Sequence, residues 1–314
     1  MRVLITGAAG NLGSALAHFL SDGPHDLRLL VHRTPLHEAA ASRRVEIVWA
    51  DLAEPATLPA VCAGVDCIVH FAGRLFAPRP ERFLPATNVA YVRHLTAAAL
   101  AAGVRKMILI SFPHVEGETS PSAPATGRPS GDPTSVHART RLAAEQVMTS
   151  AASGRPTAVV ILRAGMIYGR GVLMIEAARW LMCRRLLAVW RRPTWIHLIA
   201  LPDFLRCVQA AIEGERVAGI YNLGDREPMT LQAFLDTLAA HWGYPKPWRA
   251  PAWSFYWAGS CCEAYASVFG TASPLTRDFI RIGMASYVSD TTRMTRELLP
   301  ELAFPTFTAG LSLL

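Results

Sequence analysis

The first thirteen residues constrain the fold of this chain more than any other segment. An apolar run over residues 2–6 leads directly into Gly7, Gly10 and Gly13, and an apolar-periodic stretch continues through Leu20. In a dinucleotide-binding turn, the first glycine allows the tight turn, the second lets the backbone approach a pyrophosphate, and the third permits close helix packing. The first amides of the following helix attract the anion. Because a strand pattern and a helix pattern flank the glycines, the segment predicts a dinucleotide site.

The rest of the chain favours an α/β fold with a doubly wound parallel sheet. Strand-like runs alternate with helical patterns at residues 2–6, 27–31, 45–49, 66–70, 107–111 and 158–162. Runs that are apolar on both faces belong to parallel strands covered by helices on both sides. We expect residues 1–163 to form the nucleotide-binding part. Residues 164–314 are expected to form mainly a small substrate lobe, built from 164–197 and 224–290, while residues from about 195 to 224 return to complete the nucleotide-binding part.

Composition narrows the class of protein. The 314 residues carry a net charge of +7, almost wholly from arginine, since Lys106 and Lys246 are the only lysines. This charge suits phosphate-bearing ligands and requires no nucleic acid partner. No apolar stretch is long enough to span a membrane, and Met1 runs straight into the first strand, so a cytoplasmic location is expected. The cysteines show no metal-binding spacing, and no metal site is predicted.

Two further segments each allow two interpretations. Residues 117–134, rich in glycine, proline and serine, form either a loop that covers the active site or a disordered surface insert. The segment from Glu176 to Arg192 is interpreted as a basic amphipathic helix. It docks on a membrane surface, or, as we favour, its arginines face water or an acidic substrate. Seven of the eight tryptophans lie between Trp180 and Trp257, where they line an apolar ligand cavity or fill the core of the lobe.

Several short segments recur in an order that resembles a known family. Asp51-Leu52 follows the third strand, His70-Phe71-Ala72-Gly73 follows the fourth, and Thr87-Asn88-Val89 opens a helix. Leu162 to Gly169 is similar to an RPxxxYG turn with Ala164 in place of proline, and residues 197–204 and 219–224 match later landmarks. This order resembles the extended short-chain dehydrogenase/reductases, also called the NAD-dependent epimerase/dehydratase family, over nearly the whole chain.

The resemblance implies a Rossmann fold of about seven parallel strands with a small C-terminal substrate lobe, and it assigns roles to named residues. Asp51 and Leu52 would contact the adenine, and Asn88 would lie beside the cofactor. The pyrophosphate would be held by Thr6, Gly7, Gly10, Asn11, Leu12 and Gly13, and the path toward the nicotinamide would follow Phe71, Ala72 and Gly73. Family members often dimerise, which here would use residues 84–102 and 134–152.

The end of the second strand bears on the choice of cofactor. An acidic side chain at this place hydrogen-bonds the ribose hydroxyls of NAD. The residues here are Val31, His32 and Arg33, and a cation can instead pair with the additional phosphate of NADP. The sequence therefore favours NADP(H) over NAD(H).

The catalytic pattern of the family is replaced. Its YxxxK motif, aligned through Leu142 to Gln146, reads His137 to Arg141, and the serine position after the fifth strand falls on Phe112. In one interpretation His137 is the general acid, Arg141 binds the nicotinamide ribose, and Ser111 or His114 hydrogen-bonds the substrate carbonyl. The chain would then be an NADP(H)-dependent reductase or epimerase-like oxidoreductase acting on a bulky, largely apolar carbonyl or hydroxyl compound.

Three alternatives remain. The chain could bind NADP(H) without turnover, as a redox sensor or partner-binding protein. It could orient a substrate for isomerisation or cyclisation with hydride transfer lost. It could also be a sugar-nucleotide epimerase or dehydratase, in which Arg170, Arg179 and Arg192 meet a diphosphate.

Overall fold

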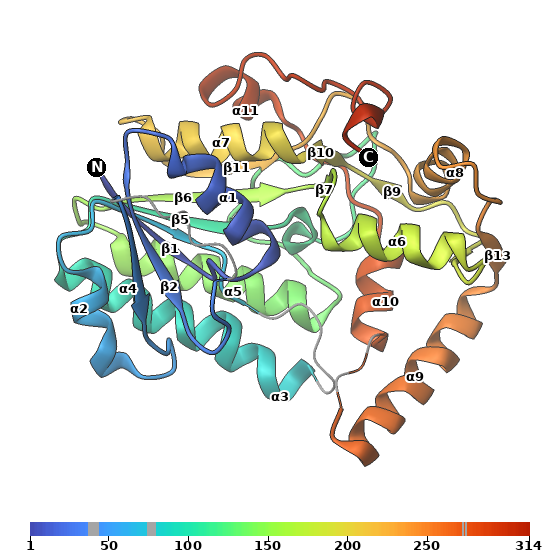
Figure 1. Cartoon of the computed structure of the whole chain (residues 1–314), viewed down its shortest axis with the longest axis horizontal. Helices are drawn as coiled ribbons and strands as arrows, with labels where there is room; N and C mark the ends of the chain where they lie inside the picture. Colours follow the sequence, from blue (N-terminus) through green and yellow to red (C-terminus); the bar gives the residue numbers. More distant parts are fainter. Residues whose placement is uncertain (37–43, 74–79, 272, 274) are drawn as a thin grey trace.

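The centre of the molecule is one parallel sheet of seven strands (Figure 1). The computed structural model describes residues 1–36, 44–73, 80–271, 273 and 275–314. The strands lie in the order β11-β6-β5-β4-β1-β2-β3, and every neighbouring pair is parallel. Their bounds are β1 Arg2–Thr6, β2 Asp26–Val31, β3 Val45–Trp49, β4 Cys67–His70, β5 Lys106–Ser111, β6 Ala158–Ala164 and β11 Gly219–Leu223.

Helices cover both faces of this sheet. Figure 1 shows α1 and α7 on one face and α2, α4 and α5 on the other. The helices of the first face are α1 Asn11–Ser21 and α7 Leu201–Glu213. Those of the second are α2 Leu58–Cys62, α3 Pro80–Leu84, α4 Tyr91–Ala101 and α5 Val136–Ala152, with a π-helical turn at Pro85–Ala90 and short 3₁₀ turns at Pro55–Thr57 and Pro113–Glu116. A doubly wound α/β fold is thereby confirmed.

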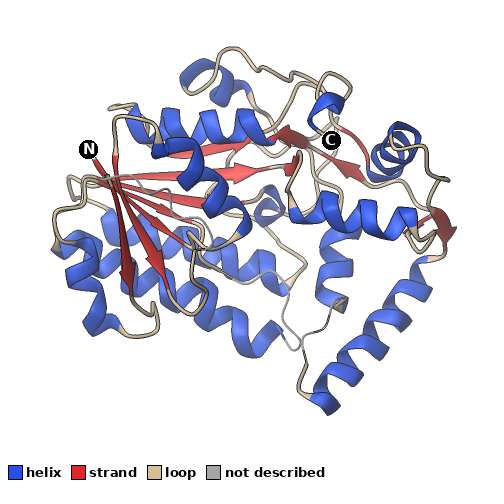
Figure 2. Ribbon diagram, in the orientation of Figure 1, coloured by secondary structure: helices blue, strands red, loops and turns tan. Residues whose placement is uncertain are grey.

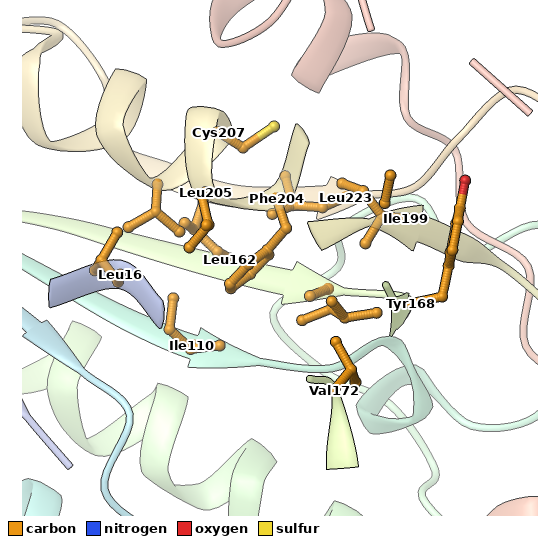
Figure 3. Close-up of a cluster of buried hydrophobic side chains, with 14 of the residues drawn as sticks. Leu16, Ile110, Leu162, Tyr168, Val172, Ile199, Phe204, Leu205, Cys207 and Leu223 are labelled. Atoms are coloured by element: carbon orange, nitrogen blue, oxygen red, sulfur yellow. The ribbon is translucent and has the colours of Figure 1, made fainter. Parts of the chain in front are cut away.

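The core consists of two apolar layers, one on each side of the sheet. In the first layer, Leu16 of α1 and Phe204 of α7 lie against Ile110 of β5 and Leu162 of β6 (Figure 3). The second layer packs α2, α4 and α5 on the other face. Burying one such side chain contributes about 1.5–3 kcal/mol, so these layers hold the strand ends, and the site built on them, in fixed positions.

A smaller set of elements lies beyond the carboxyl end of β6 (Figure 2). It contains three two-stranded sheets, in which β7 Met166–Tyr168 pairs with β10 Leu198–Ala200, β9 Trp195–Ile196 with β12 Met229–Thr230, and β8 Ala188–Trp190 with β13 Trp248–Ala250. Its helices are α6 Leu173–Cys183, α8 Leu231–His241, α9 Ala252–Phe269 and α10 Arg277–Met284. The chain ends with α11 Thr292–Glu297 and a 3₁₀ turn at Leu311–Leu313.

The expected helix from Glu176 to Arg192 is wrong in its second half. Helix α6 ends at Cys183, where the amide of Arg185 donates to Met182 O and that of Leu186 to Leu181 O. Arg185 has a left-handed backbone, with φ 57°. These contacts form a Schellman cap, which glycine usually provides. Because Arg185 fills the glycine position, the sequence offered no stop for the helix, and the following strand β8 was missed.

The segment 117–134 is held in place by hydrogen bonds to distant parts of the chain. Ala125 is buried, its amide donates to Val288 O, and its carbonyl accepts from Asn222 Nδ2 at 2.9 Å. The Thr119 hydroxyl donates to Val288 O at 3.0 Å. The interpretation as a disordered insert is therefore wrong: the loop packs along residues 286–290.

Of the seven lobe tryptophans, Trp190 and Trp242 pack against the apolar core, as one interpretation expected, whereas four others are exposed. Trp180, Trp248, Trp253 and Trp257 are 52%, 69%, 70% and 68% exposed. Neither a packed core nor an enclosed ligand cavity accounts for side chains this exposed. Over the described residues, no helix combines the length and apolarity needed to cross a membrane.

Candidate active site

The glycine turn between β1 and α1 leaves its backbone open to a ligand. Gly7 has φ 72°, and a Cβ built there would lie 2.8 Å from the amide nitrogen of Ala72. A Cβ on Gly13 would collide with the carbonyl oxygen of Gly7. Gly10 precedes the first turn of α1 and donates its amide to Gly7 O at 2.8 Å. Backbone and helix amides that no side chain covers fit a pyrophosphate.

Strands β1 and β4 are braced beside this turn. The Thr6 hydroxyl and His70 Nδ1 are 2.8 Å apart and fully buried. Burial, together with the positive charge of Arg141, lowers the pKa of His70 to about 3, so its ring is neutral. The Thr6 side chain therefore joins the two strand ends. Chains leaving β1 and β4 continue on opposite faces of the sheet, which opens the crevice where such sheets bind ligands.

Asn11 joins the glycine turn to the first residues of the lobe. Its Nδ2 donates to Gly171 O at 2.6 Å, and its Oδ1 accepts from the Leu173 amide at 3.1 Å. Leu12 is partly buried against the core, and Phe71 packs edge-on against Phe204 with ring centres 6.3 Å apart. The side chain of Asn11 thus positions the turn against the lobe.

The expected adenine end lies where β2 and β3 finish side by side. His32 Nε2 is 3.1 Å from Asp51 Oδ2, and Asp51 Oδ1 accepts from the Ala53 amide at 2.8 Å. Leu52 is buried, and Arg33 is exposed. The chain from 37 to 43 lies outside the described residues.

The opposite end of the crevice contains a buried guanidinium. A Cβ built on Gly73 would lie 2.6 Å from Arg141 Nη2 and 3.2 Å from Asn88 Oδ1, so these groups converge on one point. Asn88 lies in the π-helical turn and donates to Thr140 Oγ1 at 3.0 Å. Burial lowers the pKa of Arg141 to about 10, which leaves it charged. Within the described residues, Arg141 Nη1 and Asn88 Oδ1 have no hydrogen-bond partner.

One turn earlier on α5, His137 is buried in an aromatic cluster. Its ring centre lies 5.0 Å from that of Phe112, which lies 5.0 Å from His114, and His114 lies 4.3 Å from Tyr287. Burial lowers the pKa of His114 to about 4, so this ring is neutral at physiological pH. The backbone amides of Val136 and His137 donate to the Asp278 carboxylate at 2.8 and 3.1 Å.

Ser111 lies in a separate, buried network of charges. Its hydroxyl donates to Glu145 Oε1 at 2.5 Å. Arg163, which has no exposed surface, binds Glu145 at 2.6 Å and Glu116 at 2.7 Å. Glu116 also accepts three loop amides, those of Thr126, Gly127 and Arg128. The Ser111 proton is committed to Glu145, so this hydroxyl braces β5 against α5.

The structure adds four residues that sequence reasoning did not select: Glu116, Glu145, Tyr287 and Asp278. Tyr287 and Asp278 are more than 100 residues from the groups they contact, and their neighbouring sequence carries no motif. Glu145 lies in the segment used to align His137, but nothing in that segment predicts that its carboxylate binds Arg163. A buried Arg163 inside an apolar strand was the one available clue, because a buried guanidinium needs carboxylates.

The glycine turn, the crevice and the buried face of α5 together define a nucleotide-binding protein of the Rossmann type. The chain belongs to the NAD dependent epimerase/dehydratase family, whose model matches residues 3–192. A nicotinamide dinucleotide cofactor is expected for members of this family.

Individual relatives differ in what they act on. The chain is 29% identical to the 2-alkyl-3-oxoalkanoate reductase of Stenotrophomonas maltophilia over 276 residues, 84% of this chain and 82% of that protein. It is 36% identical to a uronate dehydrogenase of Pseudomonas syringae over 118 residues, but spans only 41% of that protein. The solved complex of MoeE5 with UDP-glucuronic acid and NAD superposes with a TM-score of 0.77 at 20% identity, over 100% of this chain and 97% of that one. At this identity the superposition establishes the fold.

Proposed function

We propose that the chain is an NADP(H)-dependent reductase of a bulky, largely apolar oxo compound, with His137 and Arg141 in place of the usual tyrosine and lysine. The observation that carries the proposal is the buried, charged Arg141, whose Nη1 finds no partner in the described chain and which adjoins Gly73 at the ends of β4 and β5. A buried N–H group without an acceptor is costly, and a bound ligand with hydroxyl or carbonyl oxygens would satisfy it.

The residues divide the chemistry as follows. A bound reduced nicotinamide would supply a hydride to the carbonyl carbon of the substrate. His137, in its protonated form, gives a proton to the substrate oxygen and is reprotonated from water. Arg141 would hold the ribose hydroxyls. Its positive charge also favours the neutral form of His137 after the proton has been given to the substrate, but Arg141 cannot relay a proton as lysine can. His114, neutral and enclosed by Phe112 and Tyr287, gives the site an apolar wall.

The substrate class rests on that wall and on one relative. A ketone flanked by alkyl groups suits a site lined by aromatic rings, and the reductase from Stenotrophomonas maltophilia is named for an alkyl-branched oxo acid. For the cofactor, the exposed Arg33 at the end of β2 supports NADP(H), because it would pair with the additional phosphate.

The test is NADPH oxidation with a long-chain 2-alkyl-3-oxoalkanoate, followed by absorbance. We expect His137→Phe to lower kcat at least about 100-fold and to remove the pH dependence that His137 confers. Arg139→Gln is the matched control, since Arg139 lies on the same helix but is exposed, and it should retain full activity. Calorimetry should show NADPH binding weakened about tenfold by Arg33→Ser, with NADH binding unchanged.

Two outcomes would favour other functions. Tight NADPH binding without turnover of oxo compounds or UDP-sugars would favour a sensor, as the replacement of all three triad positions already suggests. Turnover of UDP-sugars would favour an epimerase. The contacts of the three arginines expected to bind a diphosphate argue against an epimerase. Arg179 packs over the ring of Trp242 and Arg192 is 3.8 Å from Glu118, and neither contact brings these arginines together with each other or with Arg170.

Three further expectations belong with this proposal. A homodimer would use α4 and α5, the location would be cytoplasmic, and the lobe would act as a substrate-binding unit distinct from residues 1–163. Gel filtration, fractionation and limited proteolysis would test them separately.

A further inference from the structure

Helix α9 has an apolar outer face that nothing in the described chain covers. The 18-residue helix contains one charged residue, Glu263. Along its length, Trp253, Trp257, Tyr265 and Val268 are 70%, 68%, 61% and 76% exposed. Their spacing of four, eight and three residues places them on one side of the helix.

The opposite side of α9 is already packed. Gly259 and Ala266 are its only fully buried residues, and a Cβ on Gly259 would lie 2.7 Å from Ile280 of α10. Glu263 binds Arg277 of α10 at 2.7 Å. The helix is therefore apolar on both sides while α10 covers only one, which is unusual for a helix that faces water.

Cations and further aromatic side chains gather at the start of this helix. Figure 1 shows the end of α6, β13 and the first turn of α9 at one edge of the lobe. There a hollow of about 390 Å³ is lined by Arg185, Lys246, Trp248 and Arg249. Trp248 Nε1 donates to Arg185 O at 3.0 Å, and Arg184 lies 4.1 Å over the ring of Trp180.

Acidic groups neutralise only part of this charge. Asp236 lies 2.7 Å from Arg249 and 3.9 Å from Lys246. No carboxylate of the described residues lies within ion-pair distance of Arg184 or Arg185. We call the whole area the lobe-tip surface; its members are Trp180, Arg184, Arg185, Leu186, Trp248, Trp253, Trp257, Tyr265 and Val268.

We propose that the lobe-tip surface docks on an anionic lipid bilayer, with α9 lying flat in the headgroup layer. Tryptophan and tyrosine favour that layer because their rings are apolar and their N–H and O–H groups remain hydrated. The uncharged outer face of α9 enters the bilayer, and Arg184 and Arg185 at its edge meet lipid phosphates. This charge complementarity favours a bilayer over a second copy of the same cationic surface.

Sedimentation with vesicles tests the proposal on the full chain. Vesicles of phosphatidylglycerol and phosphatidylcholine should bind the protein, more weakly at about 0.5 M salt than at about 0.05 M, and phosphatidylcholine alone should bind it less. Trp253→Ser combined with Trp257→Ser should lower the partition coefficient at least about tenfold. It should also reduce the quenching of tryptophan fluorescence by brominated lipid.

Two single variants test whether vesicle binding depends on the positive charge of the surface and whether any exposed tryptophan would suffice. Arg185→Gly keeps the left-handed helix cap, because glycine suits that backbone, and should weaken binding about fivefold to anionic vesicles only. Trp49→Ser removes a tryptophan that is 60% exposed on the edge strand β3 and should change nothing. Circular dichroism and thermal unfolding check that all variants remain folded.

Three results would overturn the proposal. They are the absence of vesicle binding, an equal loss in Trp49→Ser, and a dimer that the double tryptophan variant dissociates while vesicles bind neither form. The last result would assign the surface to a second copy of the chain. None of these measurements depends on the proposed reaction.

Discussion

Arg163 has no exposed surface and binds two carboxylates, Glu116 and Glu145. Replacing it by methionine would remove the ion-pair partner of Glu145 and leave Glu116 only the exposed Arg128 at 3.3 Å. We therefore expect a loss of about 3–5 kcal/mol in the free energy of unfolding, measured by urea denaturation. Arg105→Gln is the control, since its ion pair with Asp66 is exposed and should be worth less than about 1 kcal/mol. A similar loss in both variants would contradict the role assigned to the network.

Asp225 makes the stability depend on pH. Burial raises its pKa to about 7, against about 3.9 in an unfolded chain. Between these values the folded protein keeps a proton that the unfolded chain has released, so the free energy of unfolding falls as the pH rises from about 4 to about 7 and is level above. Asp225→Asn removes this loss. We expect the variant to be about 2–4 kcal/mol more stable than the parent at pH 8, but nearly equal at pH 4.

Urea denaturation of both proteins at the two pH values measures this difference. The amide can still accept the Glu227 N–H that reaches Asp225 Oδ1 at 3.2 Å, so the substitution keeps that contact. A difference between the two proteins that does not change with pH would show that Asp225 ionises as it does in water.

Individual residues also show where sequence reasoning ends. Gly7 and Gly13 form the turn after the first strand as expected, because backbone geometry requires glycine at such positions and a motif records it. The hydroxyl of Ser111 was expected on a substrate but is committed to Glu145. Which acceptor a serine finds depends on tertiary neighbours, and no local pattern reports them.

At the scale of single elements, the amino end of α5 depends on the lobe. Asp278 of α10 accepts the amides of Val136 and His137, while Ser135 accepts the amide of Ala138 from within the same segment. We expect both Asp278→Ala and Ser135→Ala to reduce stability by about 1–2 kcal/mol. Only Asp278→Ala should also lower kcat for the oxo substrate, because it frees the turn that carries His137. Equal kcat values in the two variants would contradict this coupling.

The predicted boundaries of the elements match the observed ones where apolar runs are long, and differ from them where a helix ends in an unusual cap. All six strand runs expected in the first half overlap observed strands within two residues. The seventh, β11, falls in the 195–224 stretch that was expected to return to the nucleotide-binding part. Helix α6 ends earlier than expected because Arg185, with a left-handed backbone, occupies the C-cap position that glycine usually takes. An arginine in the sequence does not predict a helix end.

At the scale of the whole molecule, Asn11 is a direct link between the nucleotide turn and the lobe. Its side chain bonds Gly171 O and the Leu173 amide, 160 and 162 residues away. A cofactor that fixes the glycine turn should therefore also stabilise the start of α6. At 100 times its Kd, NADPH should add about 2.7 kcal/mol to the free energy of unfolding.

Hydrogen exchange read by mass spectrometry can follow this coupling through the chain. With NADPH bound, we expect slower exchange both in residues 7–21 and in residues 171–183. In Asn11→Ala the first effect should persist and the second should largely vanish, because the two hydrogen bonds that join the segments are gone. Ser14→Ala, which removes a hydroxyl bonded only to Asn11 O within α1, should behave as the parent. Equal protection of residues 171–183 in Asn11→Ala and the parent would mean that the lobe senses the cofactor through other contacts.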